Sequence, residues 1–428
     1  MRLIGKIAAL GMVGALALTA CGRADETATS STPTGGTTID DSPATGDISI
    51  WAMGTEGEKL PEFVKAFEAD NPDASVSVTT IPWTDVANKV QTAVAAGTVP
   101  DAIMIGSSQM AMVASTGGLQ PVPDGIAAPD DFFSGAADST YVDGVAYGVP
   151  WYVETRVLYY RSDIAAAAGV EAPTTWDEFT DFVAALQTQE GVQYGLQLPM
   201  GDAEDSTQVI IPFLSQAGGS VLNEAGDAYD LNTDAMVDAL DFYASFFVSG
   251  AADLAGYGDA QSAAFTNGTA PAMISGPWMV DVFAELEGQD WVDANVATAP
   301  VAAGSANNDS YIGGAHLGVF TDAKNSDGAW KLIKWLSQED TQQAWYDLTN
   351  DLPALQSAWD YEPLTSNPRT AVLEEQLQNT IAPPAVPSYD ELSGYIESEA
   401  EKVARQTTTA KDAAAAIQAK ADSLGLGR

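Results

Sequence analysis

Residues 47–81 read DISIWAMGTEGEKLPEFVKAFEADNPDASVSVTTI, and this stretch decides the fold. Residues 48–53 are a compact apolar run with the length of a buried strand. Apolar residues then recur with the spacing of one helix face, at Leu60, Phe63, Val64 and Phe67. Residues 75–81 alternate and are rich in Val and Thr, which predicts a second strand. Strand, helix and strand in this order predict a parallel sheet covered by helices.

The alternation of helices and strands continues beyond residue 81. The segment Thr55-Glu56-Gly57-Glu58 has the spacing of a capping box, which predicts where the first helix starts. A second helix is expected from Thr84 to Gly97, because glycine often ends helices at this position. Residues 101–105 predict a third strand, which leads into Ser107 and a new helix.

A second region of strands and helices is expected between about residues 156 and 300. Thr175 and Thr233 each precede apolar residues at helical spacing and are placed as N-caps. The last third of the chain is mostly helical, and residues 388–425 predict two further helices. The expected fold class is α/β, with mostly parallel sheets flanked by helices.

The first 21 residues have the organisation of an export signal. Arg2 and Lys6 precede an uncharged apolar stretch at residues 7–20, which is shorter than the roughly 20 residues of a membrane-spanning helix. The segment ending in Cys21 resembles a bacterial lipobox, so we expect a signal peptide at 1–20 and lipidation of Cys21. The chain has no second cysteine to pair with it. An ordinary signal peptide with an incidental cysteine is the alternative.

Composition narrows the range of partners. Residues 22–46 are dominated by Thr, Ser, Asp, Ala, Gly and Pro, which predicts a flexible spacer after the lipidated cysteine. The chain has 59 acidic and 17 basic residues, giving a formal net charge of −42. Such a charge repels nucleic acid and anionic headgroups, so neither is expected as a partner. A hydrophobic content of 46% is enough for the cores of two domains.

Polar side chains follow the first and third predicted strands. The turns after these strands hold Thr55 and Glu56 in one case, and Ser108 and Gln109 in the other. Ligands of open α/β sheets bind beyond the carboxyl ends of the strands, so these side chains are candidates for ligand contacts. Thr55 and the neighbouring Ser107 could equally serve only as helix caps.

Aromatic residues beside Pro and Gly form a second group of candidates. Trp83, Trp151 and Trp278 lie in segments of this kind, where a ring is less easily explained as core than at helical spacing. A flat ring with an apolar face suits the C–H face of a sugar. The tryptophans expected in the core are Trp51, Trp330, Trp335 and Trp345.

Signals for catalysis are poor. His316 is the only histidine, and without a partner histidine or cysteine a zinc site of the usual kind is excluded. No serine lies in a Gly-x-Ser-x-Gly elbow, and P-loop and EF-hand motifs are absent from the sequence. Carboxylates are too abundant for a glycosidase pair to be excluded by counting. We expect no cofactor, no metal ion and a binding function.

The chain resembles family 1 extracellular solute-binding proteins, the sugar receptors of bacterial ABC importers. Gly97-Thr98-Val99-Pro100-Asp101 matches the Gly-x-x-Pro-Asp turn of that family, and Gly276-Pro277-Trp278 matches its Gly-Pro-Trp block. Thr175-Trp176-Asp177-Glu178 is similar to its Thr-Trp-Asp-Glu helix start. The segment 147–163 is similar to its interdomain crossing, but ends in Tyr160-Arg161-Ser162-Asp163 instead of Tyr-Asn-Lys-Asp. The likeness extends over nearly all of residues 47–424.

The resemblance implies a two-lobed periplasmic-binding-protein fold that closes over one ligand. An N-terminal lobe at 47–152 plus 311–351 and a C-terminal lobe at 153–310 plus 352–428 are then expected. The chain would cross between the lobes near 151–155, near Tyr311 and near Leu352.

The resemblance also implies roles for individual residues. Glu154 falls on a carboxylate that contacts sugar hydroxyls in maltose-binding members, and Trp278 falls on a stacking tryptophan. Ser108 and Gln109 replace an Asp and an Arg of those members, so maltose itself is not implied. The full set of expected ligand contacts is Thr55, Glu56, Trp83, Ser108, Gln109, Trp151, Glu154, Asp205, Trp278, Gly314 and Tyr389.

The implied function is that of the substrate-binding subunit of an ABC transporter. It would capture a sugar, a di- or oligosaccharide, and deliver it to the permease subunits in the membrane. The expected location is the extracellular face of the bacterial cytoplasmic membrane, held by the lipid on Cys21, and the expected state is a monomer. A secreted carbohydrate-active enzyme and a glycan receptor without a transport role are the alternatives.

Overall fold

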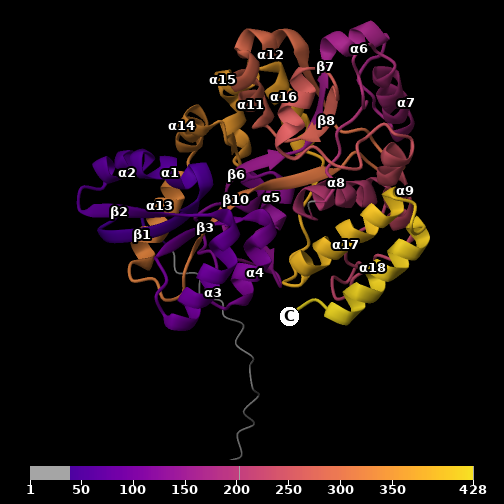
Figure 1. Ribbon diagram of the computed structural model, residues 1–428. Coiled ribbons are helices and arrows are strands. Elements are labelled where there is room, and N and C mark those ends of the chain that lie inside the picture. The colour runs from indigo at the N-terminus through magenta and orange to yellow at the C-terminus, as the bar shows by residue number, and fades with distance from the viewer. Residues whose placement is uncertain (1–38, 202, 428) are drawn as a thin grey trace, which may run out of the picture. The chain divides into compact units, whose positions relative to one another are not determined.

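The computed structural model of the protein describes residues 39–201 and 203–427, shown in Figure 1. The predicted signal peptide, Cys21 and residues 22–38 of the predicted spacer lie outside the described residues. Some described backbone positions carry side chains that the structure does not describe, namely Thr84, Ala203, Glu204, Asp205, Asp259 and Asp390.

The largest sheet in the described part of the chain has seven strands in the order β11-β6-β10-β3-β1-β2, with β12 pairing on β10. Its strands are β1 (Gly46–Met53), β2 (Ala74–Ile81), β3 (Ala102–Gly106), β6 (Val149–Thr155), β10 (Ser310–Val319), β11 (Leu352–Pro353) and β12 (Thr380–Ile381). A second sheet has the order β8-β7-β9, from β7 (Val157–Arg161), β8 (Ala272–Ser275) and β9 (Val296–Ala299). A hairpin joins β4 (Tyr141–Val142) to β5 (Val145–Ala146).

Helices surround these sheets (Figure 1). Those in the first third of the chain are α1 (Gly54–Phe63), α2 (Lys65–Asp70), α3 (Val86–Ala96), α4 (Met110–Ser115) and α5 (Ser134–Asp138). Those between β7 and β10 are α6 (Ser162–Ala168), α7 (Trp176–Gln187), α8 (Ala203–Gln216), α9 (Asp234–Val248), α10 (Gln261–Thr266), α11 (Met279–Glu287) and α12 (Gln289–Asn295). Those after β10 are α13 (Ser326–Leu336), α14 (Glu339–Thr349), α15 (Glu362–Thr365), α16 (Pro368–Leu377), α17 (Tyr389–Ala404) and α18 (Ala410–Leu424). Short 3-10 turns are η1 (Trp83–Asp85), η2 (Ser107–Gln109), η3 (Pro129–Asp131), η4 (Gly258–Ala260) and η5 (Gln356–Asp360).

The three predicted strands of the N-terminal region are confirmed as β1, β2 and β3. β1 pairs in parallel with both β2 and β3, as strand–helix–strand alternation predicts. Gly97 ends α3 in the left-handed conformation, with φ of 63°. The predicted capping box is wrong: α1 begins at Gly54, and its N-cap Met53 makes no side-chain cap.

The expectation of mostly parallel sheets is also wrong, because both sheets contain antiparallel pairs. β10 is antiparallel to β3 and to β6, and β11 is antiparallel to β6. In the second sheet β7 is antiparallel to both neighbours. The alternation of local strands and helices could not reveal these pairs, since β10 comes from the last third of the chain and inserts between β3 and β6.

The helix starts predicted at Thr175 and Thr233 are confirmed. Each side-chain oxygen accepts a hydrogen bond from the backbone three residues on, at Glu178 and Met236. The carboxylate of Glu178 accepts hydrogen bonds from the backbone N–H and the hydroxyl of Thr174. The two helices predicted in residues 388–425 are α17 and α18, which lie side by side and pack on α9 (Figure 1).

Two hydrophobic cores hold these elements. The first contains the large sheet with α13, including the predicted core residues Trp330 and Trp345. The second contains the apolar faces of α7, α9, α17 and α18. Phe265 and Leu373, from segments assigned by resemblance to the C-terminal lobe, belong to the first core. The domain boundaries stay a prediction.

The end of the predicted spacer contacts the folded part of the chain. Lys331 of α13 lies 2.9 Å from the carboxylate of Asp40, and Lys334 lies 2.7 Å from Asp41. The backbone N–H of Ala44, which is buried, donates to Asn71. The spacer composition gave no sign of these contacts, because their partners lie elsewhere in the sequence.

Candidate functional site

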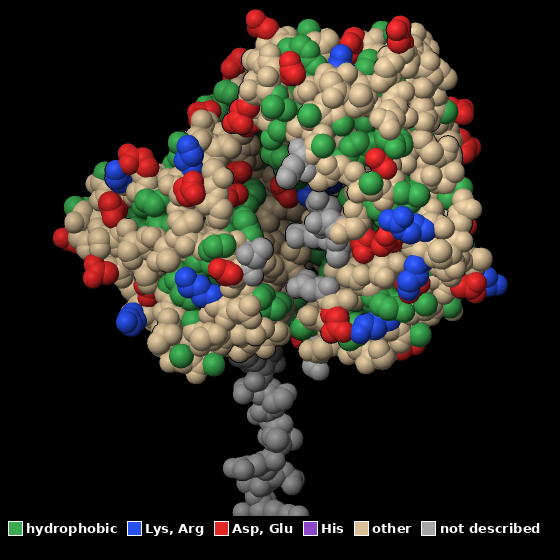
Figure 2. All heavy atoms as spheres, viewed as in Figure 1, with side chains coloured by type: hydrophobic (Ala, Val, Ile, Leu, Met, Phe, Trp, Pro, Cys, Tyr) green, Lys and Arg blue, Asp and Glu red, His purple; other side chains and the backbone are tan. Residues whose placement is uncertain are grey.

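A cavity of about 590 Å³ lies at the carboxyl ends of β1 and β3 and beside β6. This volume is within the range of about 300–1,000 Å³ that is usual for small-molecule sites. The residues that line it are Glu56, Trp83, Ala87, Gly106, Ser107, Ser108, Gln109, Tyr152, Glu154, Arg156, Gln208, Tyr311, Gly313 and Gly314. Figure 2 shows the surface hollowed on the face in view, with acidic side chains spread around it.

Trp83 forms the aromatic wall of the cavity. It opens η1 directly after β2 and is 37% exposed. A Cβ atom at Gly54 would lie 2.8 Å from its indole nitrogen, and one at Gly106 would lie 3.0 Å from Cζ3 of the ring. The indole therefore lies against two glycines that follow β1 and β3, and the bare backbone at these strand ends makes room for it.

Glu56 projects from the first turn of α1 and is held by a hydroxyl group. Tyr152 of β6 donates a hydrogen bond of 2.8 Å from its Oη to Oε1 of Glu56. Burial raises the pKa of the Glu56 carboxyl, and the nearby charge of Glu154 adds to this effect. Glu56 forms no ion pair with any residue that the structure describes.

Glu154 is held in a different way, by a cation. Nη1 of Arg156 lies 3.3 Å from Oε1 of Glu154, and Nη2 donates to the amide oxygen of Gln208. The same guanidinium lies over the indole of Trp278, 4.5 Å from the ring centre. A Cβ atom at Gly313 would lie 2.4 Å from Oε1 of Glu154, so this carboxylate requires a glycine opposite it on β10.

The turn after β3 adds amide and hydroxyl groups. Ser107 donates a hydrogen bond of 3.1 Å to the carbonyl oxygen of Gly314, which ties this turn to β10. Ser107 therefore does not act as a helix cap. Oε1 of Gln109 is buried and has no hydrogen-bond partner among the described residues. A buried acceptor without a donor is energetically costly.

Asp351, immediately before β11, interacts with both acidic groups of the cavity. Nε1 of Trp345 donates a hydrogen bond of 2.9 Å to its carboxylate. Burial, followed by the charge of Glu56, raises the pKa of Asp351 to about 8. This carboxyl is therefore mainly protonated at pH 7. No sequence pattern indicated Asp351, although it lies beside a predicted crossing between the lobes.

Six of the residues expected at the site line the cavity: Glu56, Trp83, Ser108, Gln109, Glu154 and Gly314. Thr55 is exposed on α1 and does not line it. Tyr389 is buried in the second core, at the start of α17. Trp278 is 42% exposed and reaches the cavity only through Arg156. The side chain of Asp205 lies outside the described residues.

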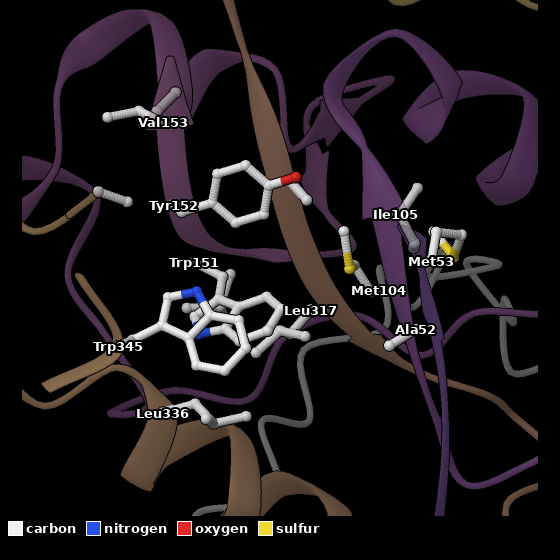
Figure 3. Packing of buried hydrophobic residues seen from close by; sticks show 14 of the residues in the cluster. Ala52, Met53, Met104, Ile105, Trp151, Tyr152, Val153, Leu317, Leu336 and Trp345 are labelled. Atoms are coloured by element: carbon white, nitrogen blue, oxygen red, sulfur yellow. The ribbon is translucent and has the colours of Figure 1, made fainter. Parts of the chain in front are cut away.

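Trp151 lies in the first core instead of the cavity. It is 1% exposed, and its ring centre is 4.7 Å from that of Trp345 (Figure 3). Side chains along an extended strand point alternately to opposite faces. Because Trp151 and Val153 point into the core, the residues between and after them point to the cavity.

This alternation also explains the residues that the sequence analysis missed. Tyr152, Glu154 and Arg156 are spaced by two and all line the cavity, so Glu154 alone indicated its two neighbours. Gln208 and Tyr311 come from α8 and β10 and carry no comparable local signal.

The only histidine takes no part in the cavity. His316 is buried in β10, and its Nε2 lies 2.8 Å from the hydroxyl oxygen of the buried Ser139. Burial lowers the pKa of His316 to about 3. Among the described residues no group of three or more His, Cys, Asp or Glu side chains is arranged to hold a metal ion. None of the described helices combines the length and apolar character needed to span a membrane.

Two curated relatives of the chain are named for oligosaccharides. It is 24% identical over 408 residues to the galactooligosaccharide-binding protein of Bacillus subtilis, covering 93% of this chain and 91% of that one. It is 25% identical over 292 residues to the maltooligosaccharide ABC transporter solute-binding lipoprotein of Streptococcus pneumoniae, covering 66% of each chain.

Solved structures are similar over nearly the whole described chain. The sugar-binding protein MalE from Xanthomonas citri superposes with a TM-score of 0.82 at 29% identity, covering 89% of this chain and 97% of that one. This likeness confirms the two-lobed α/β fold of periplasmic binding proteins. The profile of the family described as bacterial extracellular solute-binding protein matches residues 52–343. Because that match spans most of the chain and the fold agrees with it, the protein belongs to the family of bacterial extracellular solute-binding proteins.

Proposed function

We propose that this protein is the lipid-anchored receptor of a bacterial ABC importer and captures a di- or oligosaccharide in the cavity at β1, β3 and β6. The observation that carries the proposal is the pairing of a half-exposed indole, Trp83, with acceptors that face the same space. Those acceptors are Glu56, Glu154 and the unpartnered amide oxygen of Gln109. Sugars present apolar C–H faces and many hydroxyl donors, which suit this combination. The relatives named for oligosaccharides support it.

Ligand capture would be coupled to closure of the two lobes. A sugar that is held by residues of both lobes stabilises the closed form in proportion to its greater affinity for that form. The closed form would then be recognised by the permease subunits. Trp278 contacts the guanidinium of Arg156 through one face of its ring. We propose that this indole becomes a second stacking surface for the sugar after closure. Because the family is described as solute-binding, we propose that the sugar is bound without chemical change.

Thermal unfolding and calorimetry against a panel of saccharides would test this function. The panel includes maltooligosaccharides, galactooligosaccharides, common mono- and disaccharides, polyols and peptides. A ligand at 100 times its dissociation constant should stabilise the protein by about 2.7 kcal/mol. Stabilisation by a saccharide is the expected result, whereas silence across all saccharides would reject the proposal. Turnover of the bound saccharide in chromatography would favour an enzyme instead.

Substitution of the indole connects the measured binding to this cavity. Trp83→Ala should weaken saccharide binding at least about tenfold, since stacking and its apolar area are lost. Leu348→Ala on α14 is a matched control, because Leu348 is 38% exposed and Trp83 is 37% exposed. Equal affinity of both variants would place the sugar elsewhere.

A further inference from the structure

The cavity lining has more acidic than basic side chains. The charged side chains among its described lining residues are Glu56, Glu154 and Arg156. Asp351 interacts electrostatically with both glutamates, but its carboxyl is mainly protonated at pH 7, since burial raises its pKa to about 8. Two carboxylates therefore share a single guanidinium.

The guanidinium of Arg156 already has protein partners. It is 8% exposed, contacts Glu154 and Gln208 through its two terminal nitrogens, and lies over Trp278. A ligand carboxylate or phosphate that took over the contact of Nη1 would displace Glu154. Displacement would leave Glu154 without its cation in a partly buried site, which is unfavourable.

Glu56 has no such partner. The hydroxyl of Tyr152 occupies Oε1, and no described Lys or Arg forms an ion pair with this carboxylate. Glu56 is partly buried, and burial of its charge already opposes ionisation. A cation from the ligand would relieve this cost, whereas an anion would add to it.

Gln109 carries the same preference for donors. The residue lines the cavity, and its buried amide oxygen has no donor among the described residues. Hydroxyl and ammonium groups donate hydrogen bonds, and ionised carboxylates only accept them. Glu56 and Gln109 thus select in the same direction.

We propose that Glu56 makes the cavity selective for the charge of the sugar, so that a saccharide carrying an amino group binds more tightly than its neutral parent and one carrying a carboxylate is excluded. This inference rests on the proposed function and specifies the ligand class. The ammonium would lie beside Glu56 and replace the counterion that the protein does not supply. Acidic saccharides are disfavoured because the described lining has two carboxylates and one cation, Arg156, whose charge is already shared with Glu154.

Calorimetry on the purified full chain with matched saccharides tests the inference. The probes are maltotriose and a β-linked galactotriose, each with analogues in which a single C6 hydroxyl is replaced by an amino group or oxidised to a carboxylate. Each of the three rings is altered in turn, because each could lie beside Glu56. At least one amino analogue should bind about tenfold more tightly than its parent, and every carboxylate analogue about tenfold more weakly.

The variants Glu56→Gln and Glu58→Gln separate the local effect from net charge. Both remove one negative charge from α1, but Glu58 is exposed and does not line the cavity. In Glu56→Gln the amino analogue and its neutral parent should bind with nearly equal affinity. In Glu58→Gln the amino analogue should still bind more tightly than its parent. Melting temperatures would confirm that both variants fold.

The remaining outcomes separate the two proposals. If the neutral parents bind but the amino analogues bind no better, charge selection is rejected and sugar binding stands. A carboxylate analogue that binds as well as its parent also rejects charge selection. If neither parent nor any analogue binds, both charge selection and the proposed sugar-binding function are rejected for these probes.

Discussion

The cavity is bounded by two regions that hold their side chains in opposite ways. At the ends of β1 and β3, Trp83 rests on bare glycine backbone and Glu56 has a single hydroxyl partner. On β6, Glu154 and Arg156 are tied to each other, to α8 and to Trp278, and Trp151 on the other face is part of the core. The first region can therefore change with little effect on stability, whereas the second cannot.

The largest difference is expected on the core side of β6. Trp151→Ala should destabilise the fold by about 3–5 kcal/mol, because the cavity it leaves beside Trp345 cannot collapse fully. Trp83→Ala should cost less than about 1 kcal/mol, since its ring is more than a third exposed. Urea denaturation of the two variants measures both effects. Similar losses of stability would remove the distinction between the two regions.

A smaller effect is expected from the glycine beneath the indole. Gly106→Ala introduces a Cβ atom 3.0 Å from the ring of Trp83, which must then shift. We expect affinity for the saccharide to fall about tenfold, or about 1.4 kcal/mol, with the melting temperature nearly unchanged. Gly394→Ala on α17 is the control, because a Cβ atom added there would meet no heavy atom within 4 Å. A large loss of stability in Gly106→Ala would show that this region is more rigidly packed than we infer.

An effect of at most the same size concerns Asp351, which interacts with the carboxylates of both regions. Its pKa is raised to about 8 by burial, whereas an unfolded aspartate titrates near 4. At a pH between these two pKa values, the folded protein keeps a proton that the unfolded chain releases. The free energy of unfolding therefore falls as the pH rises. The slope from this group is at most about 1.4 kcal/mol per pH unit. Asp351→Asn should reduce the loss of stability between pH 6 and pH 7, as followed by urea denaturation; an unchanged slope would assign the effect to other groups.

Local patterns in the sequence predicted the elements that depend on neighbours in the chain. Strands β1 to β3, the caps at Thr175 and Thr233 and the buried faces of α7 and α9 all follow from short-range spacing. The position of β10 between β3 and β6 depends on pairing across the whole chain, and no local pattern encodes it. The antiparallel character of the sheet was missed for this reason.

The same distinction applies to the site. Glu56 and Gln109 were found because they follow strand ends, where an α/β sheet binds its ligands, and Trp83 because its ring lies beside a proline. Trp151 was misplaced because proximity to Pro150 outweighed the alternation of side chains along β6. Gln208 and Asp351 reach the site from α8 and from the residue before β11, so only the folded chain brings them there.

The uneven exposure of the tryptophans has an optical consequence. Trp151, Trp330, Trp345 and Trp359 are at most 3% exposed, whereas Trp83 and Trp278 are 37% and 42% exposed. A collisional quencher in solution therefore reaches the fluorescence of the two indoles beside the cavity and leaves these four nearly untouched. Any ligand that covers Trp83 shields part of that emission, so the protein carries an intrinsic fluorescent reporter of occupancy and needs no attached dye.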